Sequence, residues 1–150
     1  MVAIESNLFE FYGSYGRMPG ARVDSRPDML RVKTGLPHEL LNGIFRARIP
    51  EENPQAAIDA VLSDFLSERI PMMWWVGPST EPRNLGKYLE DSGLDHAGEL
   101  SGMAIDLDAL LAHLSPPPEL SIDPVRDEET LRIWLTALAV GYELPEAAVR

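Results

Sequence analysis

Histidines and clustered acids are the side chains in this 150-residue sequence that have the chemistry of metal ligands. The three histidines, His38, His96 and His113, lie far apart, and none has a second histidine four residues away. Acids gather between Asp123 and Glu129, but a calcium loop needs regularly alternating oxygen ligands and a glycine turn, which this stretch lacks. We therefore expect no metal site and interpret these acids as the solvated cap of a helix.

The sequence also contains no motif for nucleophilic catalysis. The segment Gly13-Ser14-Tyr15-Gly16 is one residue too short for the Gly-x-Ser-x-Gly turn of serine hydrolases. The sequence has no cysteine, which removes thiol nucleophiles, disulfides and zinc–thiolate sites, and which fits a reducing compartment such as the cytoplasm. No residue receives a catalytic role on this basis.

Methionine and tryptophan side chains form a set that could line a ligand pocket, because both residue types make adaptable apolar walls. The set is Met72, Trp74, Trp75 and Met103. Core packing is the competing interpretation, since the continuously apolar run from Met72 to Val76 is typical of a central strand that is covered on both faces. A cavity of several hundred cubic ångströms beside either tryptophan would favour the pocket.

Several elements that would position these residues lie in the first half of the chain. A short amphipathic helix is predicted over Asn7 to Tyr15, and strands are predicted over Met29 to Thr34 and Gly43 to Ile49. The turn at Gly35 to His38 makes the two strands an antiparallel pair. A longer helix begins at Asn53-Pro54, with asparagine as its cap, proline at its first position, and an apolar stripe of Ile58, Val61, Leu62, Phe65 and Leu66.

Beyond the apolar run, another helix is predicted over Arg83 to Asp91, with Gly93 placed for a left-handed stop. Gly102 to Leu107 and Leu120 to Val125 have the pattern of strands. Between them, the prolines at 116–118 predict an extended, stiff connector.

The last predicted helix follows Asp127 as its cap. Its apolar residues recur at i, i+3, i+4 and i+7, and they are Leu131, Trp134, Leu135 and Leu138. Left bare, such a stripe invites self-association. The alternative is that the helix folds back onto the domain's own sheet and buries the stripe there.

Composition excludes two classes of partner. A formal charge of −11 repels phosphate backbones, so we expect no binding to nucleic acid or to an anionic membrane. The longest nearly apolar stretch, Ile133 to Val140, is far too short to cross a bilayer, and Met1 to Glu10 has no basic leader. We therefore expect a cytoplasmic protein.

Three stretches carry a resemblance to a known family. Pro71 to Pro78, Leu85 to Leu94 and Gly102 to Leu107 resemble segments of the N-terminal halves of bacterial tandem GNAT-family N-acetyltransferases, and the resemblance covers roughly residues 5–145. It implies an α/β fold in which a mixed, mostly antiparallel sheet is flanked by helices in layers. It also implies a degenerate GNAT-like domain over 1–114, a proline-rich connector at 115–118, and the opening strand and helix of a second GNAT unit over 119–150.

The same resemblance implies acetyl-CoA as the cofactor of the complete protein, but not of this chain. GNAT enzymes hold the cofactor's pyrophosphate on the backbone amides of a glycine-containing loop that leads into a helix. The equivalent segment here, Pro50-Glu51-Glu52-Asn53-Pro54-Gln55, has none of those glycines. Its two prolines remove two amide donors, and its two glutamates each add up to roughly 4 kcal/mol of repulsion at an effective dielectric of about 20. We expect no cofactor-binding residue in this chain.

These expectations lead to one principal function and two alternatives. The principal one is a non-catalytic structural and interaction domain of an acetyltransferase, which contacts a second GNAT unit or a homodimer partner through the last helix. The first alternative is a stand-alone oligomeric acetyltransferase that uses Tyr142 or a glutamate as acid or base. The second is a small-molecule sensor whose pocket wall is the methionine and tryptophan set.

Overall fold

The computed structural model describes residues 2–109 and 117–145. The chain divides into two compact units, Met1–Gly102 and Met103–Arg150, and each is described by itself. This division lies ahead of the connector predicted at 115–118, of which residues 115 and 116 fall outside the described residues.

The first unit is a four-stranded mixed sheet with helices on both faces. The strands β1 (Arg22–Ser25), β2 (Leu30–Lys33), β3 (Asn42–Phe45) and β4 (Met73–Trp74) lie side by side in that order. The first two pairings are antiparallel and the β3–β4 pairing is parallel. The predicted α/β class with a mixed, mostly antiparallel sheet is confirmed, as is the antiparallel pair on either side of the Gly35 to His38 turn.

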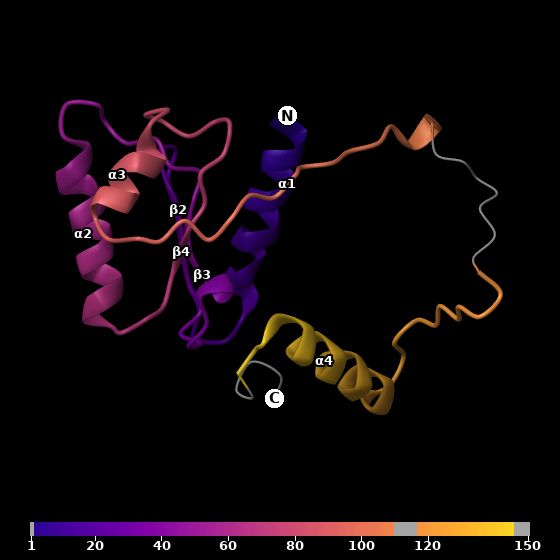
Figure 1. The fold of residues 1–150 in the computed structure, drawn as a ribbon. Helices are drawn as coiled ribbons and strands as arrows, with labels where there is room; N and C mark the ends of the chain where they lie inside the picture. The colour runs from indigo at the N-terminus through magenta and orange to yellow at the C-terminus, as the bar shows by residue number, and fades with distance from the viewer. Residues whose placement is uncertain (1, 110–116, 146–150) are drawn as a thin grey trace. The chain divides into compact units, whose positions relative to one another are not determined.

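Helix α1 (Val2–Gly13) covers one face of the sheet, while α2 (Pro54–Ser67) and α3 (Leu85–Asp91) cover the other (Figure 1). The short 3-10 helices η1 (Ser14–Arg17) and η2 (Glu39–Leu41) follow α1 and precede β3. Each face has its own core. The core under α1 contains Tyr12, Leu30, Val32 and Phe45, and the core under α2 and α3 contains Ile44, Ala47, Ile49, Ile58, Val61, Phe65, Trp74, Leu85 and Leu89.

The predicted central strand is wrong in one respect. The apolar run from Met72 to Val76 supplies only the two-residue strand β4, and β4 lies at an edge of the sheet. The run is apolar because both faces are covered: Trp74 packs in the core under α2, while Met73 and Trp75 pack against the core under α1. An edge strand with two covered faces has the same residue pattern as a central strand.

Helix α2 begins as predicted. The Asn53 side chain accepts a hydrogen bond from the Ala56 N–H at 3.2 Å, and Pro54 is the first helical residue. Ile58, Val61 and Phe65 are buried in its core-facing stripe. Leu66 is 73% exposed, so its predicted place in that stripe is wrong.

A buried cation lies between α2 and the sheet. The Lys33 side chain is almost fully buried, and its Nζ lies 2.9 Å from both an Asp64 and a Glu68 oxygen and 4.5 Å from the centre of the Phe65 ring. The pKa of Glu68 is lowered, most by its hydrogen bond from Lys33 and next by its hydrogen bond from Arg22. These contacts neutralise the charge that β2 places on the face covered by α2.

In the second unit, helix α4 (Glu128–Tyr142) is confirmed with Asp127 as its cap. The strands predicted over Gly102 to Leu107 and Leu120 to Val125 are wrong, since neither stretch is in a strand and Leu107–Ala109 forms the 3-10 helix η3. Alternating apolar residues form a strand only beside a partner that completes the hydrogen-bond ladder.

Among the residues described, no helix has the length and apolar character needed to cross a membrane.

Candidate functional site

A backbone irregularity at Arg46 lies directly after β3. Ile44 and Ala47 both face the core under α2, whereas alternation would put residues of that spacing on opposite faces. Arg46, between them, has a left-handed φ of 50°, which makes it the extra residue. Past this point the chain continues beside a different segment, because Ala47 O accepts from the Glu81 N–H at 3.0 Å and the Ile49 N–H donates to Glu81 O at 2.8 Å.

Residues 75–80 therefore leave the sheet and return to it. The last contact before they leave is the hydrogen bond from the Trp75 N–H to Ile44 O at 2.9 Å. A tight turn shapes the excursion, in which the Gly77 N–H donates to Thr80 Oγ1 at 2.9 Å and the Thr80 N–H donates to Gly77 O at 3.0 Å.

Glu5 of α1 holds this turn. Its Oε1 accepts hydrogen bonds from the Ser79 backbone N–H at 3.1 Å and from the Ser79 hydroxyl at 2.9 Å. The approach is so close that a Cβ at Gly77 would lie 2.6 Å from the same oxygen. Glu5 thus ties the covering helix to the segment that follows β4.

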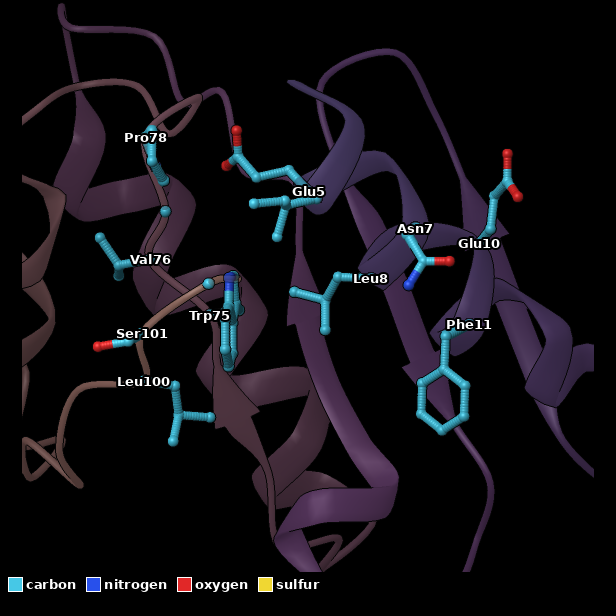
Figure 2. A pocket seen from close by; sticks show the side chains of 13 residues that line it. Glu5, Asn7, Leu8, Glu10, Phe11, Trp75, Val76, Pro78, Leu100 and Ser101 are labelled. Carbon is cyan, nitrogen blue, oxygen red and sulfur yellow. The ribbon is translucent and has the colours of Figure 1, made fainter. Parts of the chain in front are cut away.

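A first groove, the Trp75 groove, lies between α1 and the segments 75–78 and 100–102, and its volume is about 810 Å³. Figure 2 shows Leu8 and Trp75 facing each other across it, with Glu5 at one end. The only charged residues among its lining are Glu5 and Glu10. The lining also includes the Trp75 indole, the Asn7 amide and the Ser101 hydroxyl. The groove can therefore offer a ligand apolar contact, hydrogen-bond donors and carboxylate oxygens.

A second groove, the arginine groove, has a volume of about 840 Å³ and is also bordered by α1. The α1 side supplies Glu5, Ser6, Phe9, Glu10, Gly13, Ser14 and Arg17, and the rest of the lining is Val23, Ser25, Leu30, Arg46, Arg48 and Ser79. Arg46 donates through Nη2 to the Ser25 hydroxyl at 3.1 Å and to Arg26 O at 2.6 Å, while its buried Nε has no partner among the described residues. This groove presents guanidinium and hydroxyl groups.

The four residues predicted to line one pocket are in three different places. Trp74 is buried in the core under α2, and Met72 packs half-buried against that core. Trp75 alone lines a groove. Met103 is 88% exposed in the second unit. A groove of several hundred cubic ångströms does lie beside a tryptophan, but its other walls come from α1 and from residues 100–102.

The predicted interface residues all lie on α4, which has no buried residue. Leu131 and Trp134 are 42% and 51% exposed, and Leu135 and Leu138 are partly buried. Tyr142, the alternative acid or base, is also exposed, at the end of the same helix. The four stripe residues thus share one helix face, as their spacing predicts.

At the start of α2, two of the amide donors that an anion could use are not available. Asn53 takes up the N–H of Ala56, Pro54 has no N–H, and Glu51 and Glu52 are exposed beside them. The residues that the structure describes contain no group of three or more side chains placed to hold a metal ion.

Sequence reasoning missed Glu5, Ser79 and the three arginines of the second groove. Glu5 and Ser79 are 74 positions apart, so no local pattern joins them. The turn residues Gly77-Pro78-Ser79-Thr80 are a signal that the chain bends after β4, but not of what it meets there. Comparison with known proteins adds no family: no protein-family model, no curated protein and no solved structure matches this chain.

Proposed function

We propose that this chain is a non-catalytic, GNAT-like structural and interaction domain of an N-acetyltransferase whose acetyl-CoA site lies on another unit. The antiparallel run β1–β2–β3, the crossover through α2 and the parallel β4 agree with the layered fold that the resemblance implies. The observation that carries the proposal is the start of α2.

The start of α2 has fewer free donors than a helix start that holds a pyrophosphate. An anion at a helix N-terminus is held by unpaired N–H groups together with the helix dipole. Here Pro54 has no N–H to offer, and the Asn53 side chain already accepts from Ala56. Glu51 and Glu52 are exposed, so water reduces the repulsion from each to about 1 kcal/mol at about 4 Å. The missing donors are therefore the larger obstacle, and the acidic charge adds to it.

Calorimetric titration of the purified chain with acetyl-CoA tests this proposal. We expect no heat of binding up to about 1 mM ligand, which corresponds to a binding free energy weaker than about 4 kcal/mol. A double variant, Glu51→Gln with Glu52→Gln, separates the effect of the acidic charge from the effect of the missing backbone donors. We expect this variant also to show no heat of acetyl-CoA binding. Saturable micromolar binding by the unaltered chain would refute the proposal and would favour the stand-alone acetyltransferase that uses Tyr142 or a glutamate.

The interaction surface of the proposal is the α4 stripe, defined as Leu131, Trp134, Leu135 and Leu138. Its partner is a second GNAT unit or a second copy of this chain, either of which would remove the exposed half of Trp134 from water. At about 25 cal/mol per Å², covering one tryptophan and its neighbours contributes several kcal/mol to association. That contribution is large enough to detect in solution.

Sedimentation of the purified chain measures whether the partner is a copy of itself. We expect concentration-dependent association that Trp134→Glu abolishes. Thr136→Glu is the matched control, because position 136 lies about 200° around the helix from position 134 and carries the same new charge. Equal loss in the two variants would show that added charge, and not the stripe, controls association.

A small-molecule sensor is the second candidate, and the Trp75 groove favours it. Its volume falls within the range of ligand pockets, and its lining is apolar with a few polar groups. Quenching or shift of tryptophan fluorescence in a screen of small metabolites, lost in Leu8→Trp, which fills the groove, would support this function. A screen without any saturable signal would remove it.

A further inference from the structure

We propose that the arginine groove binds a small organic anion, a molecule that carries a carboxylate or a phosphate group. This inference goes beyond the proposed function, because it requires neither acetyl-CoA nor a second unit. It rests on the charge of the groove, on the conformation of Arg46 and on the donors that remain free there.

The charge of the groove runs against the charge of the chain. The sequence has 24 acidic and 13 basic residues, yet Arg17, Arg46 and Arg48 line one groove and none of them pairs with a carboxylate of the described residues. Other arginines of this unit pair with carboxylates: Arg22 with Glu68, which directly follows α2, and Arg31 with Asp64 of α2. In a chain with surplus acid, unpaired guanidinium groups gathered in a groove indicate an oxyanion ligand.

Arg46 is held in a conformation that is uncommon for a residue with a side chain. Its φ of 50° is in the left-handed region, and strained residues of this kind concentrate at functional sites. The bonds from Nη2 to Ser25 and to Arg26 O fix the guanidinium, while Nη1 has no hydrogen-bond partner among the described residues. A guanidinium that is already fixed loses little conformational freedom when an anion binds.

The hydroxyl of Ser25 adds a donor beside Arg46. Its oxygen accepts the bond from Arg46 Nη2, so its own proton is free to point to a ligand oxygen. Glu5 and Glu10 also line the groove, but Glu5 Oε1 is occupied by the two donors of Ser79. With three arginines against two glutamates, the lining keeps a net charge of +1. This charge suits a small anion with one or two negative charges better than a polyanion.

An amide-resolved NMR titration of the full chain tests the inference. The probes are inorganic phosphate and succinate, each exchanged against chloride at constant ionic strength. We expect saturable shifts at the amides of Ser25, Arg48 and Ser79 with a Kd in the low millimolar range or below. Stronger binding of phosphate would identify a phosphorylated ligand, and stronger binding of succinate would identify a carboxylate.

Matched variants decide whether the groove is responsible. Arg48 is exposed, so Arg48→Gln leaves the fold intact, and we expect it to weaken binding about tenfold. Arg46→Gln should weaken it at least as much. Arg83→Gln is the control, since Arg83 is also exposed and unpaired but does not line the groove. Absence of saturable shifts with both probes would overturn the inference, as would equal weakening by Arg83→Gln and Arg48→Gln.

Discussion

Removing the Glu5 carboxylate should loosen α1 from the segment after β4. The substitution Glu5→Ala deletes two hydrogen bonds from Ser79 to a charged acceptor. Such bonds contribute about 1.5–3 kcal/mol each when buried, and because both residues are half-buried we take about 1 kcal/mol for each. The free energy of unfolding should therefore fall by about 2 kcal/mol, which lowers the Tm of a domain of this size by about 10 °C.

Urea unfolding followed by tryptophan fluorescence measures this loss, and Glu10→Ala is the control. Glu10 lies on the same helix and lines the same two grooves, but it is exposed and forms no ion pair or hydrogen bond with the residues described. A double-mutant cycle of Glu5→Ala with Ser79→Ala should give a coupling energy of about 1 kcal/mol, because Ser79→Ala removes only the hydroxyl bond. A coupling below about 0.3 kcal/mol, with equal losses in Glu5→Ala and Glu10→Ala, would refute the reasoning.

Three further predictions concern the sheet that carries the grooves. Gly43→Ala should lower the free energy of unfolding by about 3 kcal/mol or more in urea titrations, because its Cβ would lie 2.1 Å from the Met73 carbonyl oxygen, and an unchanged midpoint would contradict this. Asn42→Ala should lower the free energy of unfolding by about 3 kcal/mol in the same assay, because four groups at the end of the β2–β3 pair lose their hydrogen-bond partner. The same substitution of an asparagine on the surface would lower it by less than about 0.5 kcal/mol. The hydrogen bond from Lys33 lowers the pKa of Glu68 from its ordinary value of 4.5, so the contribution of Glu68 to stability should be complete above pH 4.5 and lost as the pH falls below it. Glu68→Gln should therefore flatten the acid limb of a profile of Tm against pH. Parallel profiles of the variant and the unaltered chain would contradict this.

Elements with local signals could be predicted from the sequence. Asn53-Pro54 and Asp127 mark the starts of α2 and α4, and side-chain caps hold both helices as their residue types indicate. Gly93 has the left-handed φ of 89° expected of the residue that stops α3. In each case a few adjacent residues determine the backbone conformation, so the element can be predicted without knowledge of any distant contact.

Elements that depend on a neighbour could not be predicted in this way. Strand β1 was missed because Val23 is its one apolar residue, and it forms through the pairing with β2 instead. The reverse error occurred at Gly102 to Leu107, where an alternating pattern has no strand beside it in the structure. The edge position of β4 was missed for the same reason, since residue pattern reports covered faces and not the number of neighbouring strands.

The two grooves have Glu5 and Glu10 in common but differ in their other lining residues, so their functions are separable by experiment. After β4 the chain leaves the sheet, and Trp75 borders one groove while Ser79 borders the other. Glu5 lines both grooves and holds Ser79 by hydrogen bonds, whereas Arg48 lines only the second groove. Loss of the Glu5 contact should therefore change ligand binding in both grooves, while loss of Arg48 should change anion binding and leave the fluorescence of Trp75 unaltered. A sequence without catalytic motifs can thus encode two grooves, because contacts between distant residues build them.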